Sequence, residues 1–212
     1  MGLDYSYEIY IPRERAWRLL AAVGENVGRA EADGWAAVRI DERRVVLPYV
    51  GWRDGQRGVT QQLRWAADWT DRDAVVHLDL LLRFFADDEL RDYFASRARS
   101  SETALQEPDA TGRYRLGYIY LSVHDDRHCL LPGHVRFSFT AATTCMSVLF
   151  WNSPSIRDWF VHMTVRTAAS VCTLDMEGLT YLLYAHGHRM LEPVDIDSDN
   201  ALATALARLT PA

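Results

Sequence analysis

The sequence contains one order of structural patterns twice, and this repeat constrains the fold more than any other feature. An alternating strand pattern, a short amphipathic helix pattern and two further strand patterns occupy residues 4–50, and the same order recurs over residues 74–140. Strands joined by short turns, with one helix in each unit, are typical of antiparallel sheets whose helices lie on one side. The repeat is one of element order, because the two helix patterns share almost no identical residues.

The first unit opens with a half-buried strand that Pro12 ends. Apolar and polar side chains alternate along it, which is the period of a strand with one buried face. The first set is Tyr5, Tyr7, Ile9 and Ile11, and the second set is Ser6, Glu8 and Tyr10. Proline suits the first turn of a helix, so the apolar spacing that follows predicts a helix ending near Gly24. Residues 36–40 and 44–50 then predict a hairpin.

The second unit opens with the clearest strand pattern of the chain, over residues 75–85. One of its faces is rich in leucine, and the other carries His77, Asp79 and Arg83. Acidic residues at 87–89 predict the start of a helix, because negative charge is favourable near the positive end of the helix dipole. Residues 114–123 and 135–140 predict the two remaining strands.

The chain after residue 140 predicts a helical layer and a last hairpin. Ser153 and Pro154 form a helix start signal. Glu177 and Gly178 suit the left-handed torsions of a two-residue hairpin turn. The expected elements are helices at 143–151 and 155–169, strands at 171–176 and 179–184, an acidic linker at 192–199 and a short helix around Leu202 and Leu206.

These patterns predict an α+β fold. We expect a mainly antiparallel sheet from two strand-helix-strand-strand units with helices on one face, followed by a C-terminal helical pair and hairpin. With 212 residues, 49% of them hydrophobic, the chain can bury roughly 70% of its unfolded surface as a single domain. Its expected parts are the units 4–50 and 74–140, the connection 51–73, the helical layer and hairpin 141–190, and the linker and helix 191–212.

Charge and composition exclude several classes of partner. The net charge is −6 and no stretch concentrates basic residues, which argues against nucleic-acid binding. We expect no membrane segment and no signal peptide, because no apolar run is long enough. All 23 basic residues are arginine, which is typical of a GC-rich bacterial genome. Three cysteines without metal-ligand spacing favour a reducing, cytoplasmic location and no cofactor.

Two resemblances extend this interpretation. Residues 5–12, 117–123 and 139–143, with Met146, Leu149 and Phe150, resemble segments of an uncharacterised group of high-GC bacterial proteins, a resemblance that does not point to any particular activity. The doubled strand-helix-strand-strand order is similar to that of the GyrI-like family, without any shared residue motif. The second resemblance implies a small sheet that cups hydrophobic cationic ligands with aromatic side chains and a carboxylate.

The main candidate site is a polar sheet face. His77, Asp79 and Arg83 project from one side of their predicted strand, opposite its leucines. We expect Glu8, Tyr10 and Arg136 to join them from neighbouring strands. Carboxylate, aromatic and guanidinium groups that converge are typical of ligand or partner sites. The alternative is a solvated face, which antiparallel sheets often have.

A second candidate site would hold a metal ion. Imidazole, carboxylate and thiolate groups are ligands for transition metals. The candidates are His124, Asp126 and His128 in one predicted loop, joined by His186 and His188 if the last hairpin folds back. The alternative is an ordinary polar loop.

Cysteine and tryptophan each allow two interpretations. Cys145 and Cys172 lie in apolar patterns and are expected to be small core residues, whereas Cys129 lies near His128 and is a candidate nucleophile. Trp35, Trp52, Trp65 and Trp69 cluster around the connection 51–73, as a satellite core or a recognition surface.

The expected function is that of a cytosolic bacterial binding protein. It would engage a small molecule or a protein partner through the sheet face or a cleft between the units. One alternative is a metal-dependent hydrolase, or another small-molecule enzyme, that uses the loop at 124–128. The other is an immunity or assembly subunit.

Overall fold

The computed structural model describes residues 2–27, 34–40, 42–49, 67–68, 76–98, 108–124, 129–194 and 201–209. Its centre is a seven-stranded sheet in the order β12-β11-β10-β1-β9-β8-β5, in which every neighbouring pair is antiparallel. The strands are β1 (Ser6–Pro12), β5 (Val76–Leu80), β8 (Ile119–His124), β9 (His134–Ala141), β10 (Val171–Asp175), β11 (Thr180–Ala185) and β12 (His188–Val194).

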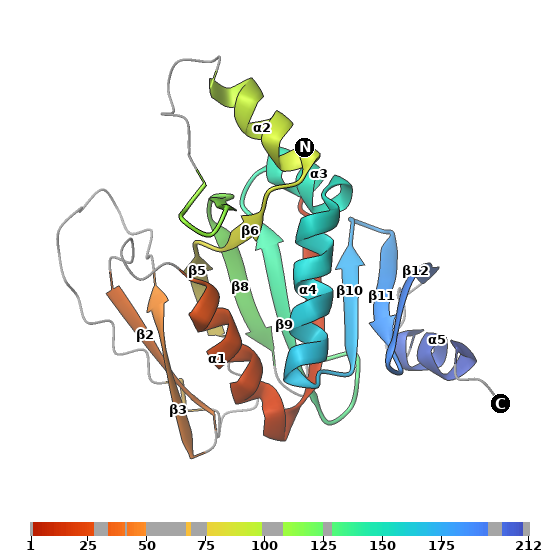
Figure 1. Ribbon diagram of the computed structural model, residues 1–212. Coiled ribbons are helices and arrows are strands. Elements are labelled where there is room, and N and C mark those ends of the chain that lie inside the picture. The colour runs from red at the N-terminus through yellow and green to blue at the C-terminus, as the bar shows by residue number, and fades with distance from the viewer. Residues whose placement is uncertain are drawn as a thin grey trace.

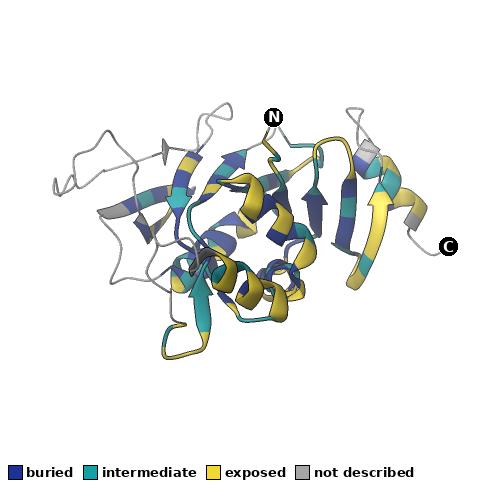
Figure 2. Cartoon of the chain, turned by 90° about the horizontal axis from the view of Figure 1, so that it is seen from above, coloured by how far each residue is buried: buried dark blue, intermediate teal, exposed yellow. Residues whose placement is uncertain are grey.

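Helices cover one face of this sheet (Figure 1). The covering helices are α1 (Ala16–Asn26), preceded by the 3-10 turn η1 (Arg13–Arg15), then α3 (Thr144–Asn152) and α4 (Pro154–Thr167). Tyr7, Ile9 and Ile11 of β1 are fully buried in the core between sheet and helices. Buried positions accordingly concentrate along the strands and the inner sides of the helices (Figure 2). The predicted α+β class is confirmed.

The two predicted units do not form equivalent parts of one sheet. In the first unit, β2 (Gly34–Ile40) and β3 (Arg43–Tyr49) form the expected hairpin, but they pair with β4 (Ala67–Asp68) in a separate three-stranded sheet. Only β1 of that unit enters the main sheet. An order of patterns along the chain therefore did not determine which strands would pair.

The strand predicted over residues 75–85 is divided into two. Leu80, Leu81 and Leu82 are all buried, so the alternation stops there and the chain leaves the main sheet after β5. The next strand, β6 (Arg83–Phe85), pairs with β7 (Arg113–Arg115) in a two-stranded ribbon before α2 (Asp88–Ala98). The strand predicted at 114–123 is divided in the same way, at Gly117 with φ of +128°.

The last part of the chain adds one strand that the sequence patterns did not predict. Glu177 and Gly178 form the expected turn with positive φ angles, and His186 with Gly187 form a second turn of this kind. The second turn leads into β12, whose residues are largely exposed and which overlaps the predicted linker 192–199. Residues 195–200 lie outside the described residues. After them, α5 (Ala201–Leu209) contributes Leu202 and Leu206 to a second apolar cluster on the other side of the sheet, which also includes Tyr10, Val171, Leu182 and Ala185.

One carboxylate, that of Asp87, joins the starts of two helices. It accepts hydrogen bonds from the backbone N–H of Leu90 in α2 and of Ser155 in α4, each at 2.9 Å. The hydroxyl of Ser153 donates to the same group at 2.6 Å and accepts from the N–H of Ile156, so Ser153 is the predicted cap. Burial opposes ionisation of Asp87, but these hydrogen bonds outweigh it and lower its pKa.

Two further sequence expectations concern residues that the structure describes only in part. Trp52, Trp65 and Trp69 lie outside them, as does the side chain of Trp35. Among the helices that the structure describes, none is both long and apolar enough to cross a membrane.

We predict that replacing Tyr7 with Phe destabilises the fold. The Tyr7 hydroxyl donates to the carbonyl of Phe150 at 2.6 Å, and its ring stacks on Phe160 at 4.0 Å. Phenylalanine keeps the stacking and leaves the buried carbonyl without this donor, which costs about 1–3 kcal/mol. Urea denaturation would measure the loss. Tyr181→Phe, at a half-buried position beside Trp151, is the control and should change the free energy of unfolding by less than about 0.5 kcal/mol.

Candidate functional site

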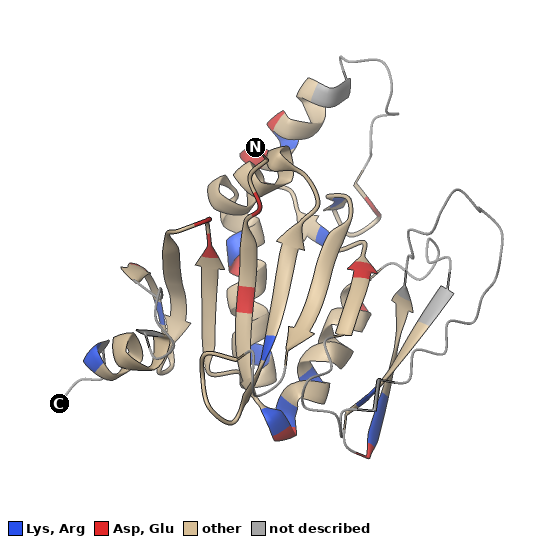
Figure 3. Ribbon diagram, turned by 180° about the vertical axis from the view of Figure 1, so that it is seen from behind, with Lys and Arg blue, Asp and Glu red and all other residues tan. Residues whose placement is uncertain are grey.

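A row of polar residues crosses five strands of the main sheet. Residues directly opposite one another in an antiparallel pair lie on the same face. The registers therefore align Thr173 of β10, Glu8 of β1, Ser138 of β9, Ser122 of β8 and His77 of β5. We call this side of the sheet the polar face. Among the described helices, none lies in front of β1, β9 and β8 on this side (Figure 3).

Two parallel rows flank the central one. The registers place the first on one side of it as Asp175, Ser6, Thr140, Tyr120 and Asp79. They place the second on the other side as Val171, Tyr10, Arg136 and His124. The hydroxyls of Ser6 and Thr140 lie 2.7 Å apart, so the rows are also joined across strands.

Glu8 is the buried centre of the polar face. Only 5% of its surface is exposed. One carboxylate oxygen accepts the Tyr10 hydroxyl at 2.7 Å, and the other accepts an N–H of the Arg136 guanidinium at 3.0 Å. Both partners are held by strands, since Tyr10 follows Glu8 by two residues and Arg136 lies opposite Tyr10.

Burial governs the ionisation of this cluster. It raises the pKa of the Glu8 carboxyl above its ordinary value, although Arg136 and Tyr10 oppose the shift. It also raises the pKa of the Tyr10 hydroxyl, and the negative Glu8 adds to that effect. For Arg136, burial acts in the opposite direction but Glu8 outweighs it, so the guanidinium pKa is raised. At the edge of the cluster, burial raises the pKa of Asp175 as well.

Two buried polar atoms beside Glu8 have no hydrogen-bond partner among the residues that the structure describes. They are Nε of Arg136 and Oγ1 of Thr173. Thr173 lies opposite Glu8 on β10, and Arg136 contacts Glu8 from β9, so the two atoms lie on either side of the carboxylate. Nearly all buried polar groups in proteins are hydrogen-bonded to protein or to ordered water, so these two atoms are positions where a water molecule or a ligand atom would bind.

The structure brings together most of the residues predicted for this site. Glu8, Tyr10 and Arg136 are in direct contact. His77 and Asp79 lie on the same face at β5, two strands from β9, where His77 Nδ1 is 2.9 Å from the Ser122 hydroxyl. Arg83 is separated from them because β5 ends at Leu80. It lies in the β6–β7 ribbon and pairs with Asp109 at 3.0 Å.

The predicted metal ligands are placed only in part. His124 is the last residue of β8, and Asp126 and His128 lie outside the described residues. His186 donates from Nε2 to the carbonyl of Leu206 at 3.1 Å, and His188 is exposed at the start of β12. Within the described part of the chain, no three His, Cys, Asp or Glu side chains gather closely enough to hold a metal ion.

The cysteines differ from one another in exposure. Cys172 is buried as predicted, and burial raises the pKa of its thiol to about 12. The prediction for Cys145 is wrong, because its side chain is exposed on the first turn of α3. Cys129 is half-buried and its thiol donates to the carbonyl of Leu131 at 3.4 Å.

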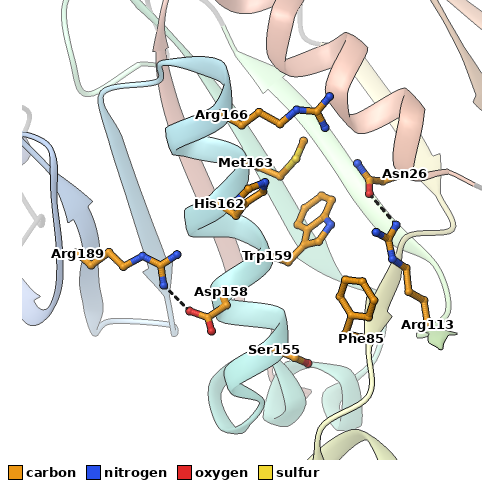
Figure 4. Close-up of a pocket in the computed structure, with 10 residues that line it drawn as sticks. All are labelled: Asn26, Phe85, Arg113, Ser155, Asp158, Trp159, His162, Met163, Arg166 and Arg189. Atoms are coloured by element: carbon orange, nitrogen blue, oxygen red, sulfur yellow. Dashed lines mark hydrogen bonds and ion pairs between the residues drawn. The ribbon is translucent and has the colours of Figure 1, made fainter. Parts of the chain in front are cut away.

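Sequence reasoning missed two groups of functional candidates. The hydroxyl residues Ser122, Ser138 and Thr173 complete the central row, and their alternate positions in predicted strands were the available signal. The second group lines a cleft of about 490 Å³ on the helix side of the sheet, between elements distant in sequence (Figure 4). No local pattern could have identified that cleft.

We predict that Glu8→Gln changes how stability depends on pH. Because folding raises the pKa of Glu8, the folded chain holds this proton more tightly than the unfolded chain, whose glutamates have a pKa of about 4.3. The stability of the native sequence should therefore fall, relative to E8Q, as the pH rises above that value. Urea denaturation of both proteins between about pH 4 and pH 7 measures the difference. If the free energies of unfolding of the two proteins change in parallel with pH, the raised pKa of Glu8 is contradicted.

We predict that thiol reagents distinguish the cysteines of the native protein. Cys145 is exposed and should be alkylated by iodoacetamide at pH 8, whereas the buried, protonated Cys172 should react only after unfolding. Peptide mass spectrometry locates the modified residue, and Cys145→Ser is the control that should remove the fast reaction. Equal rates at both positions would overturn the burial of Cys172.

Comparisons of the chain with protein-family models, with curated proteins and with solved structures find no match. The likeness to the GyrI-like family and to the high-GC bacterial group therefore stays a prediction. What the polar face can do is decided by the chemistry of its own side chains.

Proposed function

We propose that this chain is a binding protein whose polar face takes a small molecule with hydroxyl and amine groups. The observation that carries the proposal is the buried Glu8 carboxylate, held by Tyr10 and Arg136 and flanked by two unpaired polar atoms. A ligand hydroxyl beside Arg136 would accept a hydrogen bond from its Nε. Pairing of this group would remove the desolvation cost that it carries in the free protein.

The charges of the polar face favour a cationic ligand over an anionic one. Among the described residues, the registers place four carboxylates, those of Glu8, Asp79, Asp175 and Glu192, on the same face as the guanidinium of Arg136. Burial raises the pKa of both Glu8 and Asp175, so each carboxylate lacks full compensation for its charge. An ammonium group placed near them would supply that compensation and lower both pKa values.

The exposure of the polar face fits a ligand that enters from the β8–β5 side. Thr173 and Glu8 are buried, Ser138 is 9% exposed, Ser122 is half-buried and His77 is exposed. Along the central row, access to solvent thus increases from β10 toward β5. A small molecule lying over β8 and β9 would contact the half-buried Arg136 side chain and, through it, the Glu8 cluster.

A small molecule suits this face better than a protein. Protein interfaces depend on large aromatic or apolar anchors at their centre. Tyr120, 44% exposed, is the large exposed apolar side chain that the registers place here, and it lies in a flanking row. The proposal includes a bacterial setting, which the arginine-only basic composition supports, and a cytoplasmic one, which the three cysteines without metal-ligand spacing favour. The hydrolase and the immunity or assembly subunit stay untested predictions.

Three matched sugars test the proposed function. Glucosamine carries an ammonium group, glucose is neutral and gluconate is anionic, while all three carry several hydroxyls. We expect binding at pH 7 to decrease in that order, measured by isothermal titration or by saturation-transfer NMR. Glu8→Gln keeps the size of the side chain and removes its charge, and should weaken glucosamine binding by about tenfold.

The control variant removes an acidic charge elsewhere. Asp92→Asn lies on the exposed side of α2 and should leave glucosamine binding unchanged. The proposal fails if gluconate binds as well as glucosamine, if no sugar binds, or if E8Q and D92N weaken binding equally. Thermal denaturation of each variant establishes that it is folded before binding is measured.

A further inference from the structure

The cleft on the helix side lies on the opposite side of the sheet from the polar face. It has a volume of about 490 Å³, within the range of small-molecule sites. Helix α4 forms its floor, and the end of α1, the β6–β7 ribbon and β12 form its sides (Figure 4). The side chains used below are Asn26, Phe85, Arg113, Trp159, Arg166 and Arg189.

Arg113 is the central cation of this cleft. Its guanidinium lies over the ring of Phe85, with 4.5 Å to the ring centroid, and one N–H donates to Asn26 Oδ1 at 3.3 Å. Its Nε is buried without a hydrogen-bond partner. None of the described carboxylates forms an ion pair with it. The guanidinium is therefore fixed in position by a ring and a neutral amide, with charge and donors still available.

The surrounding contacts hold Arg113 in place. The side chain of Asn26 donates from Nδ2 to the carbonyl of Ala22 at 2.8 Å, which turns its oxygen toward Arg113. The ribbon places Arg113 directly opposite Phe85. Asp109 accepts the backbone N–H of Arg113 at 3.1 Å and pairs with Arg83. Arg83, predicted for the polar face, thus supports this cleft instead.

The remaining charges make the cleft locally positive on an acidic protein. Its lining includes three arginines, Arg113, Arg166 and Arg189, and one acidic residue, Asp158. Arg189 pairs with Asp158 at 2.7 Å, and Arg166 pairs with Glu25 of α1. Both pairs are half-exposed, where ion pairs contribute little and exchange readily. An incoming anion meets Arg113 without displacing a carboxylate.

Aromatic side chains form the apolar part of the cleft. Phe85 is 53% exposed and lines the cleft beside the Arg113 guanidinium. Trp159 is half-buried and packs edge-on against Phe84 at 5.4 Å, so its ring is held rigidly. Figure 4 shows Phe85 and Trp159 close to one another on the Arg113 side of α4. A planar apolar body would lie against these rings.

We propose that this cleft binds a small organic oxyanion, a carboxylate or phosphate attached to an aromatic body. Arg113 anchors the oxyanion through its remaining donors, because a guanidinium matches the geometry of two oxyanion oxygens. Phe85 and Trp159 contact the ring. This site is independent of the polar face, which lies on the other side of the sheet and favours cations.

Four benzene derivatives test the proposal on the full chain. Phenyl phosphate and benzoate carry the two oxyanions, benzyl alcohol is neutral and benzylamine is cationic. We expect both anions to bind more tightly than the other two, by isothermal titration and by saturation-transfer NMR of the ring protons. Whichever of phenyl phosphate and benzoate binds more tightly identifies the preferred oxyanion. Equal or weaker binding of both anions relative to benzyl alcohol would overturn the proposal.

Substitutions distinguish the anchor from general electrostatic attraction. Arg113→Gln should lower the affinity for the preferred anion by about tenfold or more. Arg208→Gln removes the same charge from the exposed end of α5 and should have no effect. If thermal denaturation shows that R113Q is not folded, Arg113→Lys is used in its place. Lysine keeps the charge without the planar guanidinium and should still lower the affinity. Unchanged affinity in the folded Arg113 variant would refute the assignment. Glu8→Gln should not affect these probes.

Discussion

The alternation of side chains along β1 is the constraint on which the rest of the structure depends. Tyr7, Ile9 and Ile11 lie on the face that α1 and α4 cover, and Ser6, Glu8 and Tyr10 lie on the other. A shift of one residue in its pairing would exchange these sets, placing the Glu8 carboxylate in the apolar core. Such a buried charge would cost several kcal/mol. The registers of β9 and β10 against β1 therefore determine the core and the polar face together.

The two candidate sites use this division differently. The polar face is built from neighbouring strands, so its side chains are spaced by the sheet itself and its polar groups lie in rows. The cleft on the helix side is built where the end of α1, the β6–β7 ribbon, α4 and β12 meet, and its groups come from five segments that are distant in sequence. One is acidic and the other locally basic. A chain of net charge −6 can thus present opposite charges on its two sides.

Sequence patterns predicted what depends on neighbouring residues. The cap Ser153, the turn at Glu177 and Gly178, and the two faces of β1 follow from local torsions and alternation, and all are present. The patterns failed where distant contacts decide. Leu80 to Leu82 end a strand because all three are buried, and β2 and β3 pair outside the main sheet. Glu8, Tyr10 and Arg136 could be grouped from alternation, whereas Arg113 and Trp159 meet only through the tertiary fold.

The position of β1 has a consequence for how the chain reaches this structure. β1 comes from residues 6–12, yet both strands that flank it come from beyond residue 133. The centre of the sheet therefore forms only after most of the chain has been synthesised. Such long loops must close before the contacts that stabilise them form, and the entropic cost of closure slows folding. Until β9 and β10 have been synthesised, both edges of β1 can pair with wrong strands, and its exposed apolar face makes the chain prone to aggregation. During synthesis, this strand is therefore open to wrong pairing for longer than strands such as β10, whose partner β11 follows directly along the chain.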